Sequence, residues 1–269
     1  MLKSMASPAG MESVCEQCGG SGWRPEAVKA PRVTPEVVPC ECRASANLEK
    51  TLRRAGIPKR FAEKTLAGFA IAPEGQENAT LKKARLRALR FVENYPIEKT
   101  GPLFFGPCGI GKSHLAVGIV RELRERGIGA VYCNMKDLLQ ELRYSFNPVA
   151  QTTEAELLRG IIEADVLVID DLGAERLTDW VQETIYHVIN SRYQRDRTTI
   201  VTTNLDYAGP LTLEEEHPQS RLAADAARRA VRKETLGDRV GQRIWSRLTE
   251  MCSPVAMQGE DRREKMRKL

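Results

Sequence analysis

A glycine-rich motif stands near the middle of the chain: Gly106-Pro107-Cys108-Gly109-Ile110-Gly111-Lys112-Ser113. It fits G-x-x-x-x-G-K-[ST], the pattern of a phosphate-binding P-loop. The apolar residues 103–105 before it predict a buried strand, and apolar residues recur at helical spacing in residues 114–126 after it. A strand, the motif and a helix in this order argue against a chance glycine-rich turn. We therefore predict an α/β fold, a parallel sheet flanked by helices.

The motif supplies the groups that hold the phosphates of a nucleotide. Its glycines allow backbone N–H groups to surround phosphate oxygens, and the N-terminus of the following helix adds partial positive charge. Lys112 is expected to reach the β- and γ-phosphates of ATP or ADP, and Ser113 to place its hydroxyl on Mg²⁺. The nucleotide-binding stretch includes His114, although its imidazole is expected to pack on the helix rather than transfer protons.

The length and composition of the chain fit a globular protein with a sizeable core. Its 269 residues suffice for one large domain and a small one. The net charge of +5 permits nucleic-acid binding without requiring it. No apolar run approaches the roughly 20 residues that span a bilayer, and the N-terminus lacks the apolar core of a signal peptide. We therefore expect a cytoplasmic protein with no membrane partner.

Four cysteines form two close pairs within residues 1–50: Cys15, Cys18, Cys40 and Cys42. Four thiolates suit tetrahedral Zn²⁺ and leave no coordination position open, so we predict a structural zinc module. A segment this short buries little apolar surface, and the metal is expected to supply much of its folding free energy. A redox pair or a disordered tail with incidental cysteines are the alternatives. The other cysteines, Cys108, Cys133 and Cys252, are interpreted as small buried residues.

A helical linker is predicted over residues 51–78, and an ATPase domain over residues 79–269. A helix is expected from Thr80 to Asn94, with Asn78 or Thr80 as its cap. Its apolar face is predicted to contain Leu81, Ala84, Leu86, Leu89 and Val92. The segment Ile57–Phe69 has two interpretations: it packs on the adenine of the nucleotide, or it is a plain linker whose aromatic residues pack in the core.

Further strands of the sheet are predicted from short apolar or β-branched runs. Residues 130–134 and 198–203 are such runs, and residues 254–257 are expected to form the last strand. Residues 165–169 contain the continuous apolar run Val166–Ile169, as expected of a strand that is buried on both faces. Helices are predicted over residues 136–146 and 153–163.

Acidic and amide side chains follow two of these strands. Asp170 and Asp171 end one apolar run, and Asn204 follows the β-branched strand. Ligands of parallel α/β sheets bind at the carboxyl ends of the strands, beside the P-loop in this chain. We expect Asp170 to hold the Mg²⁺ shell and Asp171 to orient or deprotonate the attacking water. Asn204 is expected to hold the γ-phosphate or the water, unless it only turns the chain.

Arginines recur near the C-terminus at a spacing that predicts a stripe. Arg239, Arg243 and Arg247 stand at i, i+4 and i+8, beside an apolar face formed by residues 240, 244 and 248. Such a stripe can present an arginine finger to the ATP of a neighbouring subunit, where a cation offsets charge that develops during phosphoryl transfer. Residues 210–237 are interpreted as a charged surface insertion, with mixed charges typical of a solvated helix face.

Taken in order, the motifs of the chain resemble those of the DnaC/DnaI-type replicative helicase loaders, AAA+ proteins with the IstB-type transposition ATPases as close relatives. The resemblance covers most of the chain. It rests on Cys15-x-x-Cys18-Gly-Gly-Ser-Gly-Trp23 with Cys40-x-Cys42, Ala55-Gly-Ile-Pro58, the P-loop, Val168-Ile-Asp-Asp-Leu-Gly-Ala-Glu175, Ile189-Asn-Ser-Arg-Tyr193, Ile200-Val-Thr-Thr-Asn204 and Ser246-Arg-Leu-Thr-Glu-Met-Cys252.

This resemblance implies an AAA+ ATPase that binds ATP and Mg²⁺, associates as a curved oligomer, binds single-stranded DNA and places a ring helicase on it. Lys112 and Ser113 match Walker A, and Asp170 and Asp171 match Walker B. Asn204 matches sensor 1. The finger is assigned to Arg243, with Arg239 and Arg247 as rivals, and Arg143, Tyr144 or Phe146 are candidates for DNA contact.

The chain departs from the wider AAA+ pattern in two places. Asp171 stands where many members have glutamate, and a shorter carboxylate is expected to position water less well and slow the turnover. Too few residues follow Asn204 for a full helical lid domain, so closure over the nucleotide is expected to depend on a neighbouring subunit.

Two rival functions remain from the sequence. One is a transposition helper that coats duplex DNA and directs a transposase. The other is an adaptor that holds ATP or ADP with almost no turnover. The cysteine module favours the helicase loader, because IstB-type proteins are expected to resemble the chain only from the P-loop region onward.

Overall fold

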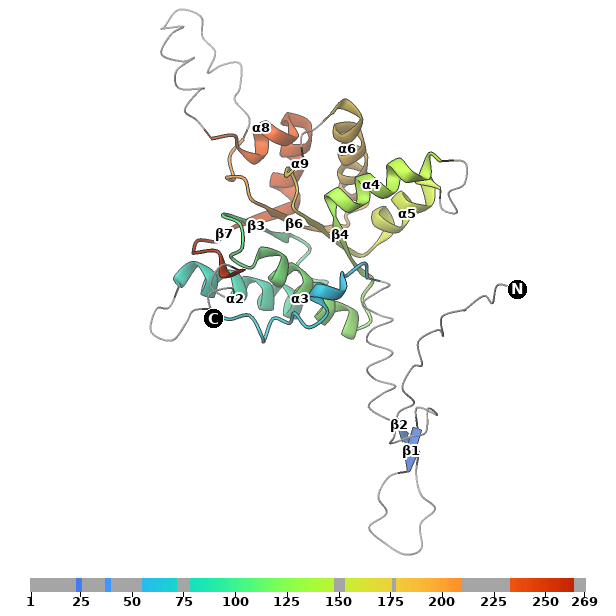
Figure 1. Cartoon of the computed structure of the whole chain (residues 1–269), viewed down its shortest axis with the longest axis vertical. Coiled ribbons are helices and arrows are strands. Elements are labelled where there is room, and N and C mark those ends of the chain that lie inside the picture. Colours follow the sequence, from blue (N-terminus) through green and yellow to red (C-terminus); the bar gives the residue numbers. More distant parts are fainter. Residues whose placement is uncertain are drawn as a thin grey trace, which may run out of the picture. The chain divides into compact units, whose positions relative to one another are not determined.

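Figure 1 shows the computed structural model of the chain, which separates into two compact units, Met1–Arg53 and Arg54–Leu269. In the first unit the structure describes the backbone of residues 23–25 and 37–39. In the second it describes residues 55–71, 78–147, 153–175, 178–209 and 233–263. Of the helices within these ranges, none is long and apolar enough to cross a membrane.

The described part of the first unit is a short antiparallel pair of strands. Strand β1 (Trp23–Pro25) pairs with β2 (Val37–Pro39), with Trp23 opposite Pro39. The predicted zinc ligands Cys15, Cys18, Cys40 and Cys42 lie outside the described residues. In the sequence they flank this pair of strands on both sides.

The second unit is built on a five-stranded parallel sheet with the order β4-β5-β6-β3-β7. Its strands are β3 (Gly101–Phe105), β4 (Ala130–Asn134), β5 (Val166–Asp170), β6 (Thr198–Thr203) and β7 (Cys252–Ala256). Strands β5 and β6 are buried along their whole length, which explains their continuous apolar or β-branched sequences. The prediction of a parallel α/β sheet flanked by helices is confirmed, and the arrangement is consistent with an AAA+ P-loop fold.

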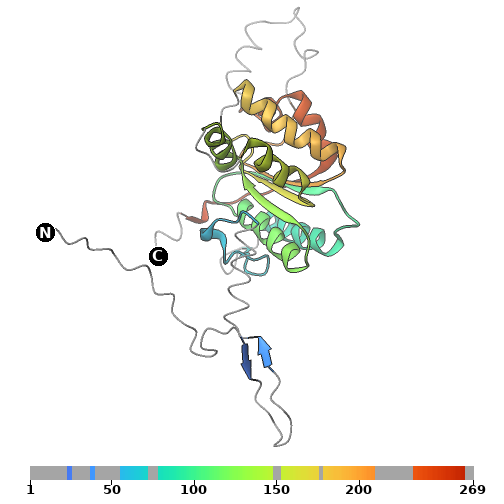
Figure 2. The ribbon, with the colours of Figure 1, turned by 90° about the vertical axis from the view of Figure 1, so that its right-hand side faces the viewer.

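Helices cover both faces of the sheet (Figures 1 and 2). One face is covered by α2 (Ala79–Asn94) and α3 (Lys112–Glu125). The other is covered by α4 (Met135–Ser145), α5 (Glu154–Glu163), α6 (Asp179–Gln194), α8 (Leu236–Val240) and α9 (Gln242–Met251). A short 3₁₀ helix, η1 (Lys59–Phe61), precedes α2. Because helices pack on both faces of the sheet, the strand ends are where a ligand can approach it.

Helix α2 begins where the sequence predicts, but its buried face is rotated. The side chain of Asn78 accepts hydrogen bonds from the backbone N–H groups of Thr80 and Leu81 and caps the helix. The buried residues are Leu81, Ala84, Ala88, Phe91 and Val92. Leu86 is 45% exposed, so its predicted place in the apolar face is wrong. At 100° per residue it lies about 140° around the helix from Leu81, on the solvent side.

A buried arginine ties three elements together behind the sheet. Arg192 of α6 is fully buried, and its guanidinium donates to the carbonyl oxygens of residues 161, 162 and 164 at the end of α5. It also donates to the backbone oxygen of Thr198 and the hydroxyl of Thr199, at the start of β6. Burial lowers the pKa of Arg192 to about 9. The hydrogen bonds therefore offset a large desolvation cost and fix where β6 begins.

Candidate nucleotide-binding site

The P-loop connects β3 to α3, and its glycines have backbone conformations that other residues rarely adopt. Gly106, Gly109 and Gly111 have φ angles of 136°, 75° and 107°. A Cβ atom on Gly106 would lie 2.0 Å from the backbone oxygen of Met257, and one on Gly111 would lie 2.6 Å from the Phe69 ring. The loop therefore requires glycine at these positions for its backbone path and for the close approach of its neighbours.

Lys112 is a buried cation whose hydrogen-bond acceptors are neutral oxygens. Its ammonium group donates to the backbone oxygens of Gly106 and Pro107 at 2.8 and 2.6 Å, and to the side-chain oxygen of Asn204 at 2.6 Å. Burial lowers the pKa of Lys112, with smaller opposing effects from neighbouring groups. A buried cation held by neutral groups favours an incoming anion, and this loop therefore fits the phosphates of a nucleotide.

The parallel strands bring the predicted polar residues to the same edge of the sheet. Phe105, which precedes the P-loop, pairs with Thr203, which precedes Asn204. Asp170 is the last residue of β5 and pairs with Asn134 at the end of β4. The carboxyl ends of parallel strands are where ligands of this class of sheet bind. The predicted Walker A, Walker B and sensor residues thus lie at one edge.

Asp170 is 1% exposed, and two hydroxyl groups hold its carboxylate. Tyr132 donates to one oxygen at 2.6 Å, and Thr202 donates to the other at 2.5 Å. Each carboxylate oxygen has a further lone pair. The Asp170 carboxylate is therefore suited to a hard cation such as Mg²⁺, and the second ligand predicted from the sequence, Ser113, lies in the first turn of α3.

Asp171 adopts a left-handed backbone conformation with a φ of 59°. Its backbone N–H donates to the Thr202 hydroxyl at 3.0 Å, and its carboxylate accepts a long hydrogen bond of 3.4 Å from the side-chain amide of Asn204. Burial raises the pKa of Asp171, and the charge of Asp170 raises it further. A half-buried carboxylate with a raised pKa, beside the P-loop lysine, is suited to orient a water molecule.

Tyr132 and Thr202 are the two site residues that sequence reasoning missed. Tyr132 lies on β4 and Thr202 on β6, on either side of β5, so both reach Asp170 from neighbouring strands. Their hydroxyls belong to stretches of sequence whose pattern predicts a strand and gives no sign of a functional role. The signal that could have identified them is a side-chain hydroxyl in a predicted buried strand, one or two residues before the end of that strand.

The segment before α2 packs against the P-loop helix. Ile57, Leu66 and Phe69 are buried, and the Phe69 ring meets the His114 imidazole edge to face, with centroids 5.2 Å apart. A ring nitrogen of His114 lies 2.9 Å from the backbone oxygen of Thr65. His114 packs against this segment, and burial lowers its pKa. Contact of this segment with adenine stays a prediction.

Two sequence interpretations near this site are wrong. Cys108, expected to be buried, is exposed at the tip of the P-loop, whereas Cys252 is buried and Cys133 is half-buried. The arginine stripe is interrupted, because Gly241 has a φ of 81° and ends α8 before α9 begins. Arg239 therefore belongs to a different helix from Arg243 and Arg247.

The three arginines have different surroundings. Arg239 donates to the backbone oxygens of Gly173 and Glu175 and pairs with Glu234. Arg247 donates to the side chain of Asn190 at 2.8 Å and to the Tyr186 hydroxyl. The Arg243 side chain is 65% exposed, with its guanidinium 3.8 Å above the Tyr186 ring. Arg243 is therefore the most accessible of the three to another subunit.

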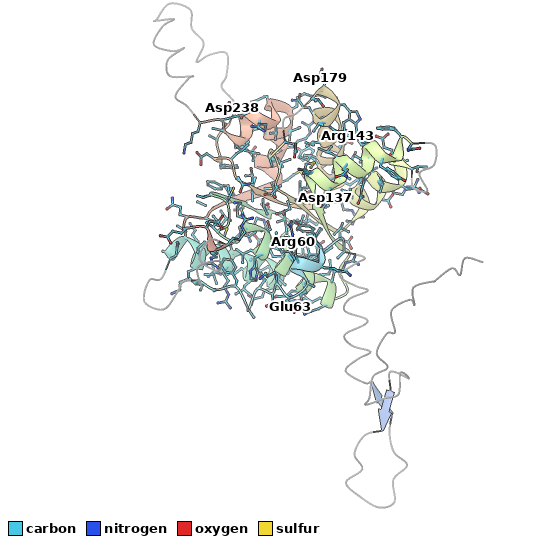
Figure 3. All side chains as sticks on the ribbon, in the orientation of Figure 1. Arg60, Glu63, Asp137, Arg143, Asp179 and Asp238 are labelled. Carbon is cyan, nitrogen blue, oxygen red and sulfur yellow. The ribbon has the colours of Figure 1, made fainter. Side chains whose placement is uncertain are left out.

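Aromatic and basic side chains gather where α4 ends. Tyr144 and Phe146 are 61% and 58% exposed. The Phe146 ring meets the Trp180 ring of α6 at 6.1 Å, and the guanidinium of Arg143, labelled in Figure 3, lies 5.5 Å from the same ring. Exposed rings beside an arginine are typical of a surface on which unpaired bases stack.

Comparison with known proteins places this site in a family. Residues 39–211 match the family described as IstB-like ATP binding protein. Over 157 residues the chain is 29% identical to the replicative helicase loader DnaC of Escherichia coli strain K12, which covers 58% of the chain and 62% of that relative. The match to the IstB-like family begins well before the P-loop, so the expectation that this likeness starts at the P-loop is wrong.

Solved structures have the same fold. The crystal structure of the DnaC helicase loader, 28% identical, superposes with a TM-score of 0.57 over 75% of this chain and all of that one. The crystal structure of DnaI, 23% identical, superposes with a TM-score of 0.52 over 78% of this chain and 99% of that one. With its P-loop and strand-end carboxylates at one edge of the sheet, the chain belongs to the family of IstB-like ATP binding proteins.

Proposed function

We propose that the chain binds ATP with Mg²⁺ at this edge of the sheet and hydrolyses it to ADP and phosphate. The observation that carries the proposal is the hydrogen-bonded series from Lys112 through Asn204 to Asp171, which joins the P-loop to the ends of β6 and β5. It holds a cation, an amide and a carboxylate next to each other, the three kinds of group that phosphoryl transfer to water needs.

Each residue has a separate role in the proposed reaction. The P-loop amides and Lys112 bind the phosphates, and Ser113 with Asp170 hold Mg²⁺, which offsets phosphate charge when bound. Asp171 orients the attacking water and accepts its proton, a task that a raised pKa makes easier at neutral pH. Asn204 holds the side chains of Lys112 and Asp171 in fixed positions relative to each other.

We propose that hydrolysis depends on assembly. Arg243 of one subunit is the candidate finger for the nucleotide of the next, because its guanidinium is exposed and held in place by the Tyr186 ring. Because this cation reaches the nucleotide only when two subunits associate, the rate of ATP hydrolysis depends on assembly. The expected form of the assembly is a curved oligomer of this chain.

We propose that the assembled protein loads a replicative ring helicase onto single-stranded DNA. The proposal is supported by the 28–29% identity to proteins named DnaC helicase loader. Because the chain aligns with 62% of the Escherichia coli relative, the shared region supports the ATPase core more directly than the helicase contact. Tyr144, Phe146 and Arg143 are the proposed stacking surface for the strand.

We also propose that residues 1–50 form a module held by Zn²⁺ on Cys15, Cys18, Cys40 and Cys42. The pairing of β1 with β2 supports it, because the antiparallel pair brings the chain after Cys18 back beside the chain before Cys40. Metal analysis of the purified protein should give one zinc per chain. Cys18→Ser should abolish the zinc content, and Cys252→Ser should leave it unchanged; equal zinc content in both variants would refute the module.

The test of function compares ATP hydrolysis by the purified chain alone, with a single-stranded oligonucleotide and with the same sequence as duplex. Stimulation by the single strand, together with co-purification of a ring helicase, is the expected result. Preference for duplex and capture of a transposase would favour the transposition helper. No turnover with either DNA, and nucleotide that stays bound, would indicate the adaptor.

A further inference from the structure

A cavity of about 400 Å³ lies at the edge of the sheet opposite the P-loop, and we call it the amino-end cavity. It is lined by residues of the loop between α2 and β3, by Asp165 just before β5, and by residues 195–198 between α6 and β6. Thr198 begins β6, whereas Asn204 follows its last residue. Six residues of strand, at about 3.3 Å each, separate the two by about 20 Å. The amino-end cavity is therefore distinct from the nucleotide site.

Thr198, which lines this cavity, has a buried hydroxyl with no partner. The residue is 3% exposed, and its hydroxyl makes no hydrogen bond to any residue that the structure describes. The next hydroxyls along the strand differ, because Thr199 accepts from Arg192 and Thr202 donates to Asp170. Buried polar side chains are seldom left unpaired, because the loss of their hydration is costly. A ligand oxygen in the cavity would supply the missing partner.

Three cations line the cavity, and most of their donors are unused. Lys99 donates to Asp196, and Arg197 donates to Asp165 at 2.5 Å. Arg195 donates to a backbone oxygen of α6 at 3.1 Å. Within the described ranges these are the only hydrogen bonds of the three side chains. Since a guanidinium carries five N–H donors and an ammonium three, the cavity is rich in donors that lack an acceptor.

The two carboxylates of the cavity already have partners. Asp165 accepts from Arg197 through one oxygen and from a backbone N–H at 3.1 Å through the other, and Asp196 is paired with Lys99. Three cations against two carboxylates leave a net charge of +1 on the lining. Behind the start of β6, the fully buried Arg192 adds a further positive charge. The charge and the spare donors together favour an anionic ligand.

Tyr95 adds a hydroxyl group to the lining of the cavity. Burial, followed by the charge of Asp165, raises the pKa of Tyr95, whereas the charges of Arg197 and Lys99 lower it by less. The phenol therefore keeps its proton at neutral pH and can donate a hydrogen bond. These charges act on it because it lies among them. The cavity thus combines neutral hydroxyl donors with cationic ones, as sites for oxyanions do.

We propose that the amino-end cavity is a second ligand site, which binds the phosphate group of a small phosphorylated molecule between Arg195, Arg197 and the Thr198 hydroxyl. A phosphate monoester presents several acceptor oxygens and up to two negative charges, so it can accept from two guanidinium groups and a hydroxyl at once. The volume of about 400 Å³ leaves room for the rest of such a molecule, since small-molecule sites measure about 300–1,000 Å³. The inference is independent of the proposed ATPase activity, because it uses the opposite edge of the sheet.

The test measures binding of glycerol 3-phosphate to the full chain by titration calorimetry. Lys112→Ala should retain the binding, because the P-loop is not the site. Thr198→Val and Arg195→Gln should each weaken it about tenfold, the usual effect of losing a hydrogen bond to a charged group. Acetate, with one charge and two oxygens, should bind at least about tenfold more weakly than glycerol 3-phosphate.

Matched controls separate loss of the site from loss of the fold. Arg90→Gln changes an exposed arginine on α2, and Thr184→Val removes a hydroxyl that donates within α6. Both should bind glycerol 3-phosphate as the unaltered chain does. Thr198→Val keeps the shape of the side chain and removes a hydroxyl that has no partner to lose, so its Tm should equal or exceed that of the unaltered chain.

The outcomes separate this inference from the proposed function. If Lys112→Ala abolishes the binding of glycerol 3-phosphate while Thr198→Val and Arg195→Gln retain it, the phosphate is bound at the P-loop and the second site is refuted. If the unaltered chain binds ATP but no glycerol 3-phosphate, the second site is likewise refuted and the nucleotide site stands. Equal affinity for acetate would overturn the assignment to phosphate.

Discussion

Lys112 and Asn204 stand 92 positions apart in the sequence, yet the ammonium of the first donates to the amide oxygen of the second over 2.6 Å. The contact exists because β6 lies beside β3, so the residue after β6 reaches the helix that follows the P-loop. The same amide donates to Asp171 at 3.4 Å. Asn204 therefore links the group expected to bind phosphate with the group expected to orient water.

Asn204→Ala should slow hydrolysis more than it weakens binding. The P-loop retains its backbone amides and Lys112, so the Kd for ATP should change little. The kcat should fall by about tenfold or more, as expected when a hydrogen bond to a charged group is lost. Asn204→Asp should instead raise the Kd, because a new carboxylate beside Lys112 would neutralise the cation. A Kd that rises with alanine and not with aspartate would contradict this role.

Tyr132→Phe should weaken the hold on Mg²⁺. The substitution removes the hydroxyl that donates to Asp170 at 2.6 Å and leaves the ring in place. We expect the Mg²⁺ concentration for half-maximal hydrolysis to rise about tenfold, since a charge-assisted hydrogen bond is worth about 1.5 kcal/mol or more. Tyr193→Phe, which removes a hydroxyl that donates to the exposed Glu250, is the matched control. An identical Mg²⁺ dependence in the two variants would show that Tyr132 does not position Asp170.

Asp171→Asn should stabilise the protein while abolishing its activity. Because the pKa of Asp171 is raised in the fold, its ionised form is less favourable there than in the unfolded chain, and this cost is present at neutral pH. The cost falls as the pH drops through the folded pKa and the carboxyl becomes protonated. Asparagine also tolerates the φ of 59°.

Thermal unfolding at two pH values checks this prediction. The Tm of Asp171→Asn should exceed that of the unaltered chain at pH 8, and the gain should shrink near pH 4. Hydrolysis by the variant should fall by about 100-fold or more, the usual contribution of a general base. A lower Tm at pH 8 would show that the charge of Asp171 stabilises the fold instead.

Arg192→Met should destabilise the second unit. The variant leaves the carbonyl oxygens at the end of α5 and the start of β6 without their donor, inside the core. Removing one partner from a buried charged network costs about 3 kcal/mol or more. Arg195→Met, at an exposed position on the next turn, should change the free energy of unfolding by about 0.5 kcal/mol or less. Urea unfolding of both variants compares them directly, and equal midpoints would contradict the account.

Much of the fold could be predicted because the central strands β5 and β6 are buried on both faces. Residues 130–134 and 198–203 coincide with β4 and β6, because each is a short run of mostly apolar or β-branched residues. The P-loop was equally clear, because its glycines have φ angles that few other residues tolerate. Local sequence therefore determines these elements almost alone.

Other features depend on how the elements pack, and no local pattern encodes them. The hydroxyls of Tyr132 and Thr202 acquire a role only through the order of the strands, which places β4 and β6 on either side of Asp170. The arginine stripe was predicted from helical spacing that continued across Gly241. The positive φ of this glycine instead ends α8 there, before α9 begins. The charged C-terminal sequence likewise did not predict that Met257 and Arg262 donate backbone hydrogen bonds to Phe105 and Gly109, beside and within the P-loop.

The central claim is that an ATPase site of one subunit is completed by Arg243 of the next. The most direct measurement mixes Asp171→Asn with Arg243→Ala, in the presence of single-stranded DNA, and records ATP hydrolysis. Each variant alone should be nearly inactive, with Arg243→Ala reduced about a thousandfold. Their mixture should regain substantial activity, because the intact site of one subunit then meets the intact Arg243 of the other. A mixture as inactive as its components would contradict a finger supplied between subunits.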